Sequence, residues 1–283
     1  MAYYAASIEL ILIFMKTNRL LTLLTTSILF SGGVASAGMM GTEFYLNPYQ
    51  WTGWHVGANF GAAWGDVQNT LSIVNAPSPA NLFNPPSIPG VNASGSNTLD
   101  FARFTPGFQV GYDKQFSNSL VVGLELSYNY INLIQSKGGT FQYTTSNNEY
   151  SLITDASTKQ LITLRPRIGY AVKKFLPYLT GGGAETTLLK FNQVFSDTSA
   201  QQSLSIQSRN TKFGWAAGGG LEYSLFDFMS IRAEYLYTSF NGFNVNTDFQ
   251  GTQALAGKSA MMNNALSNLN IQTMLFGINA HFS

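Results

Sequence analysis

Apolar and polar residues alternate in eight segments of the chain, each of about ten residues, and this is the strongest pattern in the sequence. The segments span residues 54–64, 104–113, 120–131, 161–171, 178–188, 213–223, 229–238 and 271–283. About ten residues are what a tilted β-strand needs to cross the hydrocarbon of a membrane. The pattern therefore predicts membrane-spanning strands.

The connections between these segments are alternately long and short. Three are tight turns, with the sequences KQFSNS, VKKFLP and SLFDF, whereas the other four run to roughly 20–40 residues. Outer-membrane barrels have short periplasmic turns and longer extracellular loops. We therefore predict an all-β fold, an eight-stranded antiparallel up-and-down transmembrane β-barrel with four long extracellular loops and three short periplasmic turns.

Residue parity assigns the two faces of each strand. In segment 161–171, Ile162 and Leu164 share one face, whereas Arg165 and Arg167 share the other. In the segments as a group the charged residues share their face with glycine, so we expect the apolar face to meet lipid. This is the reverse of a soluble lipocalin-like barrel. Pro166 removes a ladder hydrogen bond, and we expect a local bulge there.

The inward-facing charged residues form the main predicted cluster of the sequence. By parity they are Asp113, Glu125, Arg165, Arg167, Glu185, Glu222, Arg232 and Glu234. Buried charges are tolerated when they are paired and hydrogen-bonded, so we predict a lumenal ion-pair network. One interpretation is a plug that fills the narrow lumen. The other is a gate whose pairs exchange to admit water and small ions.

The chain has only two histidines, His55 and His281. Closure of a barrel makes the last strand a neighbour of the first, so we expect these side chains to lie close together, inward and near the periplasmic end. They are a weak candidate ligand pair. No third ligand is evident, and we predict no metal, no cofactor and no catalytic residues.

Composition agrees with a membrane barrel. The 283 residues are 45% hydrophobic and only 10% charged, whereas about a quarter of the residues in soluble domains are charged. Cysteine is absent, which excludes disulfides and thiol chemistry. A net charge of +1 provides no basic field for nucleic acid.

The N-terminal region predicts export. From Met15 the chain has a basic region, an apolar run and an A-x-A site formed by Ala35 and Ala37, so we expect cleavage before Gly38. Residues 1–37 are thus predicted to be an upstream extension plus a cleavable signal peptide, with translation from Met15; an uncleaved anchor is the alternative. Residues 38–50 are expected to be a periplasmic segment and residues 51–283 the barrel.

The four long connections span residues 65–103, 132–160, 189–212 and 239–270. The first contains APSPANLFNPPSIPG, which favours an irregular exposed loop, and the others are rich in Ser, Thr, Asn and Gln. Residues 259–269 could form a short helix over the barrel mouth, although apolar loop packing explains their two methionines equally well. Functional residues favour loops on a rigid scaffold.

Five motifs follow one another along the chain, GWHVGANFGAAWG, FTPGFQVGYDKQF, LVVGLELSYNY, FGWAAGGGLEYSL and SIRAEYLYT. In this order they resemble the small outer-membrane β-barrel family, which is opacity-type and similar to the OmpA transmembrane domain. The resemblance implies an eight-stranded barrel inserted by the outer-membrane assembly machinery, with Phe276, Ile278 and Phe282 in the position of the assembly signal. It also implies porin-like surface antigens, adhesins, structural barrels, weak pores or haem-binding proteins.

We therefore expect a protein of the outer membrane of a Gram-negative bacterium, in contact with outer-membrane lipid and not an enzyme. Its expected role is structural and surface-interacting, adhesin- or antigen-like, with a host or environmental ligand at the loops. A narrow porin-like channel gated by the lumenal ion pairs is the alternative. An outer-leaflet lipid-modifying enzyme comes third.

Overall fold

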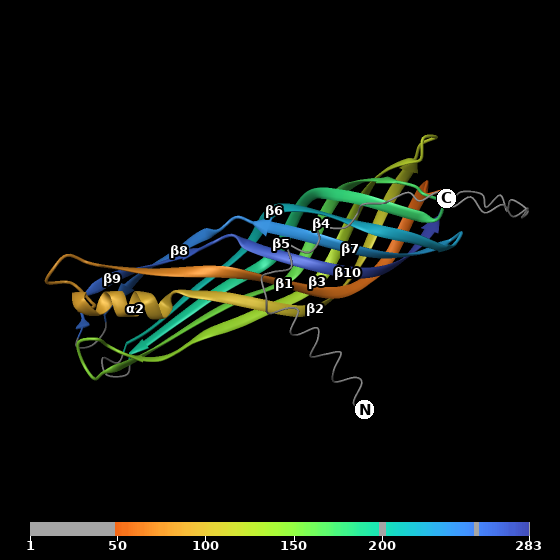
Figure 1. Cartoon of the computed structure of the whole chain (residues 1–283). Coiled ribbons are helices and arrows are strands. Elements are labelled where there is room, and N and C mark those ends of the chain that lie inside the picture. The colour runs from red at the N-terminus through yellow and green to blue at the C-terminus, as the bar shows by residue number, and fades with distance from the viewer. Residues whose placement is uncertain (1–48, 198–201, 252–254, 283) are drawn as a thin grey trace, which may run out of the picture. The chain divides into compact units, whose positions relative to one another are not determined.

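The computed structural model describes residues 49–197, 202–251 and 255–282, which form ten strands and two short helices (Figure 1). The strands are β1 (Gly53–Asn75), β2 (Asn97–Gln115), β3 (Leu120–Gln142), β4 (Glu149–Tyr170), β5 (Phe175–Asp197), β6 (Gln202–Phe226), β7 (Met229–Phe240), β8 (Phe243–Gln250), β9 (Ser259–Leu266) and β10 (Leu269–Phe282). The helices are η2 (Pro85–Ser87) and α2 (Ile88–Gly95). The predicted signal peptide, with Ala35, Ala37 and Gly38, lies outside the described residues.

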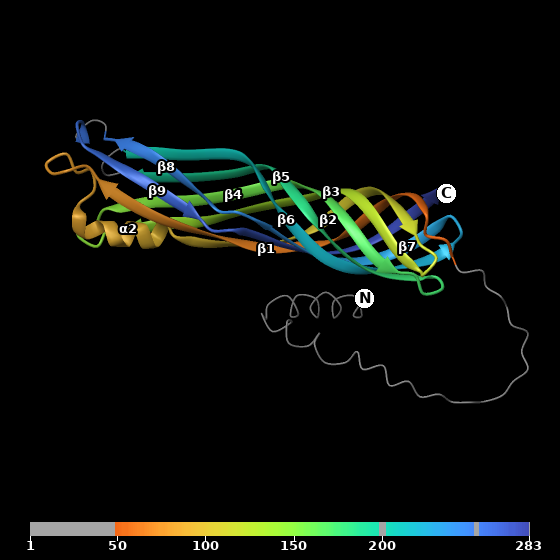
Figure 2. The same cartoon turned by 90° about the horizontal axis from the view of Figure 1, so that it is seen from above.

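Eight of the strands form a closed antiparallel ring. Their order is β10-β7-β6-β5-β4-β3-β2-β1, and β10 also pairs with β1. The connections β2–β3, β4–β5 and β6–β7 are short and lie at one end, together with the start of β1 and the end of β10. We call this the short-turn end and the opposite one the long-loop end (Figures 1 and 2).

The long connections differ from the expected irregular loops, because the strands continue through them. β1, β3, β4, β5 and β6 each have 22 to 25 residues, about twice the length that crosses a membrane. β8 and β9 form a hairpin, and β9 pairs with residues 69–75 of β1. Within the part of the chain that the structure describes, no ladder joins β8 to β6, and the two strands meet through side chains, with Lys212 Nζ 3.9 Å from the centre of the Phe243 ring.

The expectation of a helix over residues 259–269 is wrong. Residues 259–266 form β9, in which Ala260 and Met262 face inward and Met261 faces outward. The two methionines therefore fall on opposite faces of a strand. The α-helix α2 does lie at the long-loop end, but together with η2 it comes from the first long connection.

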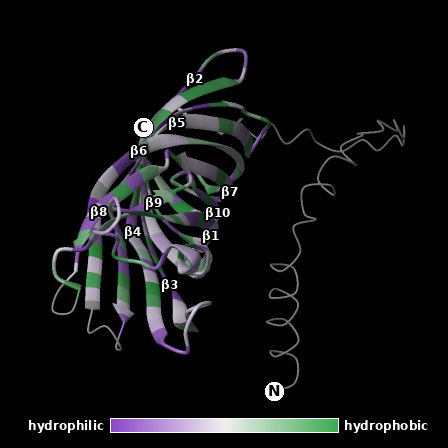
Figure 3. Cartoon of the chain, turned by 90° about the vertical axis from the view of Figure 1, so that its left-hand side faces the viewer, coloured by the Kyte–Doolittle hydropathy of each residue, from purple (hydrophilic) through white to green (hydrophobic). Residues whose placement is uncertain are grey.

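The outer face of each long strand changes from apolar to polar between the short-turn end and the long-loop end. On β6 the outward residues near the long-loop end are Ser203, Ser205, Gln207 and Arg209, whereas those nearer the short turns are Phe213, Trp215 and Leu221. On β1 the outward residues change in the same way, from Trp54, Phe60 and Trp64 to Asp66, Gln68 and Thr70. Because exposed apolar side chains require lipid, this change marks the membrane boundary. Figure 3 shows hydrophilic and hydrophobic residues alternating along the strands.

Aromatic rings lie at both edges of the apolar belt. Trp54 and Tyr112 contact each other near the short-turn end, with ring centroids 5.4 Å apart. Trp215 and Tyr237 contact each other near the other edge, at 5.5 Å. Such girdles are typical of barrel proteins at the two membrane interfaces. None of the helices in the described residues has the length and apolar character needed to cross a membrane.

The interior of the barrel changes in the opposite sense, from polar inside the belt to apolar above it. Inside the belt the lumen holds buried charged and amide side chains, including His55, Asn59 and Arg165. Above the belt the inward residues are apolar, and Leu71 and Leu152 belong to a buried cluster that α2 and the hairpin β8–β9 help to enclose. The extension therefore has a core of its own, like that of a soluble protein.

The bulge expected at Pro166 is not present. Pro166 pairs with Leu124 of β3 in an unbroken register, and the β4–β5 register is the same on both sides of the proline. Its ring faces outward, and its carbonyl oxygen accepts a hydrogen bond from the Thr180 hydroxyl at 3.0 Å. The register shift between β3 and β4 lies elsewhere, between Tyr130 and Leu133.

Candidate functional sites: a lumenal ion-pair network and a pocket at the long-loop end

The structure brings seven of the predicted inward charges together within the belt. They are Asp113 on β2, Glu125 on β3, Arg165 and Arg167 on β4, Glu222 on β6, and Arg232 and Glu234 on β7. All seven side chains are buried. Each comes from an inward position of its strand, as parity predicts, and together they cross the lumen.

Glu125 is the centre of this network. Its carboxylate accepts hydrogen bonds from Arg165, with Nη2 and Oε1 2.8 Å apart, and from Arg232, with Nη1 and Oε2 2.5 Å apart. Arg165 also contacts Glu234, at 3.0 Å between Nη1 and Oε1. Glu222 and Arg232 are cross-strand partners, yet the Arg232 guanidinium reaches across the lumen to Glu125. The pairs therefore link β3, β4 and β7 rather than only neighbouring strands.

Arg167 links the other two carboxylates. Its Nε lies 2.7 Å from Asp113 Oδ1, and its Nη2 contacts Asp113 Oδ2, so the pair is bidentate. Its Nη1 lies 3.1 Å from Glu222 Oε2. Glu222 also accepts hydrogen bonds from Ser230 and Asn279. These fixed, multiply hydrogen-bonded charges are what a buried network requires.

Glu185 does not join the network, contrary to the prediction. It lies on the outer face of β5, paired with Ile162 and Phe213, both of which face outward. The inward residues of this strand are its neighbours Ala184 and Thr186. The glycines at 181–183 carry no side chain that could reveal the parity of β5, which explains the error.

The two histidines meet as the sequence suggested. His55 and His281 are direct cross-strand partners, with ring centroids 5.9 Å apart. Both ring nitrogens of His55 face acids, since Nδ1 lies 3.3 Å from Asp113 and Nε2 3.3 Å from Glu125. His281 Nε2 lies 2.8 Å from Ser230 Oγ. The histidines are thus engaged by the ion-pair network.

Aromatic residues just before β1 cover the short-turn mouth of the lumen. Trp51 is buried, its ring lies edge-on to Tyr49 at 4.6 Å and to His281 at 5.7 Å, and its backbone N–H donates to Gln115 Oε1 at 2.9 Å. Together with Leu176 they form a small buried cluster. Parity carries no information at these positions, because the residues precede the strand.

A layer of amides lies directly above the charges. Asn59, Gln109, Asn129 and Asn279 are joined by hydrogen bonds of 2.5 to 2.7 Å across strands β1, β2, β3 and β10. Above them the cluster that contains Ala63, Phe191 and Phe240 is apolar. The lumen is therefore crossed in succession by aromatic, charged, amide and apolar side chains.

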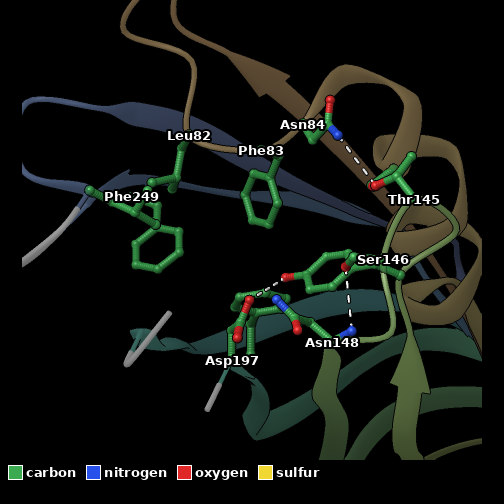
Figure 4. A pocket seen from close by; sticks show the side chains of 12 residues that line it. Leu82, Phe83, Asn84, Thr145, Ser146, Asn148, Asp197 and Phe249 are labelled. Atoms are coloured by element: carbon green, nitrogen blue, oxygen red, sulfur yellow. Dashed lines mark hydrogen bonds between the residues drawn. The ribbon is translucent and has the colours of Figure 1, made fainter. Parts of the chain in front are cut away.

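A pocket of about 250 Å³ lies at the long-loop end (Figure 4). It is lined by Leu82, Phe83, Asn84, Ser87, Tyr143, Thr145, Ser146, Asn148, Phe195, Asp197, Phe249 and Leu255. These residues come from η2 and the connection before it, from the β3–β4 turn, from the end of β5, and from the hairpin strand β8 together with the segment that follows it. The pocket leaves no signal in the sequence, because four separate segments build it and none carries a local motif.

Hydrogen bonds between these segments fix the walls of the pocket. Asn84 and Ser87 each bond the Thr145 hydroxyl, at 3.3 and 2.7 Å, and this joins the first connection to the β3–β4 turn. Tyr143 donates its hydroxyl to Asp197 Oδ2 at 2.7 Å, which joins that turn to β5. Figure 4 shows Phe83 pointing into the space between Phe249 and Asp197.

The residues in the position of the assembly signal lie on the outer face of β10. Phe276, Ile278 and Phe282 are all exposed and belong to the apolar belt.

A closed antiparallel ring with an apolar belt outside and paired charges inside defines an outer-membrane β-barrel. The chain belongs to the outer membrane protein beta-barrel domain family, whose profile matches residues 29–261. This confirms the predicted family and the location in the outer membrane.

The relatives include two kinds of Brucella outer-membrane protein. The 31 kDa outer-membrane immunogenic protein of Brucella melitensis is 29% identical over 216 residues, which cover 75% of this chain and 81% of that protein. The 25 kDa outer-membrane immunogenic protein of Brucella abortus is 38% identical over 90 residues, 32% of this chain and 36% of that protein.

Solved barrels are also similar. Ail of Yersinia pestis, in complex with the heparin analogue sucrose octasulfate, matches 80% of this chain and 99% of its own at 15% identity, with a TM-score of 0.29. OprG of Pseudomonas aeruginosa matches 83% of this chain and 99% of its own at 15% identity, with a TM-score of 0.39.

Proposed function

We propose that this protein is a structural and surface-interacting protein of the outer membrane, adhesin- or antigen-like, whose ligand binds at the long-loop end. The eight-stranded ring spans the membrane, the long-loop end is extracellular, and the short turns are periplasmic. The observation that carries the proposal is the pocket at the tip of a strand extension with a polar outer face. The names of the Brucella relatives, immunogenic proteins, fit exposure of this end.

The filled lumen supports a structural rather than a conducting ring. Glu125 and the three arginines occupy its centre, and Trp51 covers its short-turn mouth. Removing one partner from such a network leaves an uncompensated buried charge, so rearrangement into a water path is unfavourable. The network is therefore proposed to be a plug, and the narrow gated channel and the outer-leaflet enzyme have less support.

Insertion into the membrane is proposed to use the outer face of β10. Phe276, Ile278 and Phe282 present an apolar stripe on the strand that closes the ring, in the position that the assembly machinery reads in related barrels. Their contact with outer-membrane lipid follows from the same exposure.

The surface role is tested with bacteria that display the full chain. Ser146 lines the pocket, and Ser146→Trp is expected to reduce attachment to host cells or to an environmental surface several-fold by filling it. The matched control is Ser203→Trp, the same change on the outer face of β6. Equal attachment by both variants and by the unchanged protein would contradict the proposal.

The channel alternative is tested in planar bilayers with the full chain. We expect no discrete openings, because charged and apolar layers cross the lumen. Openings whose size changes in Arg165→Ala protein would favour the gated channel instead, since Arg165 contacts both Glu125 and Glu234.

A further inference from the structure

Three basic side chains lie together on the outer face of the barrel, on the long-loop side of the apolar belt. They are Lys159 on β4, Lys190 on β5 and Arg209 on β6, all exposed, and we call them the boundary cluster. The three strands are consecutive in the ring (Figure 2). Lys190 is the direct cross-strand partner of Arg209 and, on its other side, of Ser157, two residues before Lys159. Because directly opposite residues have Cβ atoms about 4.5–5.5 Å apart, the cations form one patch.

The boundary cluster lies at the level of the lipid headgroups. Arg209 precedes the belt residue Phe213 by four positions, and Lys159 precedes the belt residue Ile162 by three. At about 3.3 Å per residue and a tilt of about 40°, these steps rise by about 8–10 Å along the membrane normal. The headgroup layer is about 5–8 Å thick, and the long side chains of Lys and Arg can bend toward it. The charges therefore reach the phosphate groups of the adjacent leaflet.

The boundary cluster has no counter-charge of its own. Among the described residues, none of its three side chains takes part in an ion pair or a hydrogen bond, and the exposed ion pair joins Lys137 to Asp100 elsewhere on the barrel. Two acids lie near it on the same face, but Asp155 accepts the Asn192 amide at 3.3 Å, and Glu185 is level with the belt. Like charges directly opposite each other destabilise a sheet. An external anion would relieve this repulsion.

The other side of the ring carries the opposite charge at this boundary. Asp66 on β1 and Asp100 on β2 are direct cross-strand partners on the outer face. In the order of the ring, β1 and β2 lie across from β5 and β6. A diffuse attraction to anionic lipid would need no such division, whereas a localised site on β4–β6 does. An anion is therefore expected to bind on that side alone.

The position directly above the belt favours a lipid over a soluble anion. Guanidinium and ammonium groups bind phosphate through charge-assisted hydrogen bonds, and basic residues at the membrane surface recognise lipid headgroups in this way. Below the cluster, Ile162 and Phe213 on the same outer face offer an apolar surface to acyl chains. A lipid meets both surfaces at once. A soluble polyanion would contact only the charges.

We propose that Lys159, Lys190 and Arg209 bind the headgroup phosphates of a lipid in the outer leaflet, whose acyl chains lie against Ile162 and Phe213. Three cations match a headgroup with two phosphate groups, which is the charge of a diphosphorylated glycolipid. This site is distinct from the pocket at the tip and goes beyond the surface role. It uses the orientation proposed above, with the long-loop end outside.

The test is native mass spectrometry of the full-length protein, released from maltoside micelles after titration with diphosphoryl lipid A. The matched ligand is monophosphoryl lipid A, which keeps the acyl chains and lacks one phosphate group. We expect this second lipid to bind at least about fivefold more weakly, because it loses one phosphate contact with the cations. Equal affinity for the two lipids, or binding of neither, would overturn the proposal.

Two double variants locate the site. Lys190→Gln/Arg209→Gln removes two charges from the cluster and is expected to weaken binding of diphosphoryl lipid A roughly 20-fold, at about fivefold for each charge. Lys114→Gln/Lys173→Gln removes two exposed charges at the short-turn end and is expected to leave the affinity within about twofold. An unchanged affinity in the first variant, or an equal loss in both, would overturn the assignment. Heat-modifiable gel mobility verifies that both variants are folded.

A sulfated polysaccharide is the other polyanion that exposed cations could bind, and heparin serves as its probe. Heparin binding that is lost in Lys190→Gln/Arg209→Gln protein, together with equal affinity for the two lipids, would overturn the lipid assignment. The proposed surface role is judged separately. If the lipids do not bind but Ser146→Trp still reduces attachment, the surface role stands and the lipid site fails.

Discussion

Glu125→Gln is the sharpest test of the lumenal network. Glu125 is 2% exposed, and its two short contacts, with Arg165 and Arg232, are hydrogen bonds between charged groups. Each such bond contributes about 1.5–3 kcal/mol, so the pair contributes about 3–6 kcal/mol. Removing one partner of a buried ion pair costs about 3–5 kcal/mol. We therefore expect the substitution to lower the free energy of unfolding by about 3–5 kcal/mol.

The double variant Glu125→Gln/Arg165→Met supplies the internal check. It removes one acid and one base, so the remaining charges balance as they do in the unchanged protein. The loss should be smaller than the sum of the two single losses by at least about 1 kcal/mol, because the two residues contact each other. Strict additivity would refute the assignment of a direct ionic coupling.

The assay is urea unfolding of the full chain in detergent micelles, followed by tryptophan fluorescence and by the mobility difference between folded and boiled samples on gels. Glu149→Gln is the control, because Glu149 is exposed at the start of β4, and a change within about 0.5 kcal/mol is expected. If Glu125→Gln falls within about 1 kcal/mol of the unchanged protein, the network is not a stability element.

Further predictions concern the extension and the leader. Because the pKa of Tyr143 is raised in the folded state, its hydroxyl keeps the proton there at a pH where the unfolded chain has lost it. The stability that this contributes is present below about pH 10 and is lost as the pH rises further. In Tyr143→Phe protein the denaturant midpoint should therefore depend less on pH between about pH 9 and about pH 11. Leu152→Ala removes a fully buried side chain, should cost about 2–5 kcal/mol, and should admit proteases at the long-loop end before the belt strands lose their folded gel mobility. The mass of protein purified from the outer membrane should place its first residue at Gly38, and a mass that retains residues 15–37 would contradict this.

Much of the ring followed from the sequence, because lipid imposes a simple period of two. Arg165 and Arg167 alternate with large apolar residues, so their inward direction was readable, and the meeting of His55 with His281 followed from ring closure alone. The predicted inward position of Glu185 is wrong, because the glycines before it have no side chains that would distinguish the polar face of the strand from the apolar one. Parity is informative only where the two faces of a strand differ in chemistry.

The extension and its pocket were harder to predict, for two physical reasons. Above the belt, water replaces lipid outside and an apolar core replaces charge inside, so residues such as Ser205 and Ile206 continue the strand with the polarity of the two faces reversed. The composition of this region resembles that of loops. The pocket joins Phe83, Tyr143 and Asp197 across long sequence separations, and only the closed sheet brings them together.

The length of β6 beyond the apolar belt determines how far the binding end reaches. From Phe213 to Ser203 the strand rises by about 33 Å, at about 3.3 Å per residue. With a tilt of about 40° this places the tip about 25 Å beyond the hydrocarbon. The headgroup layer on one side of a bilayer is only about 5–8 Å thick. A ligand attached to a bulky particle could therefore be held at the tip while the particle itself stays clear of the bacterial lipid.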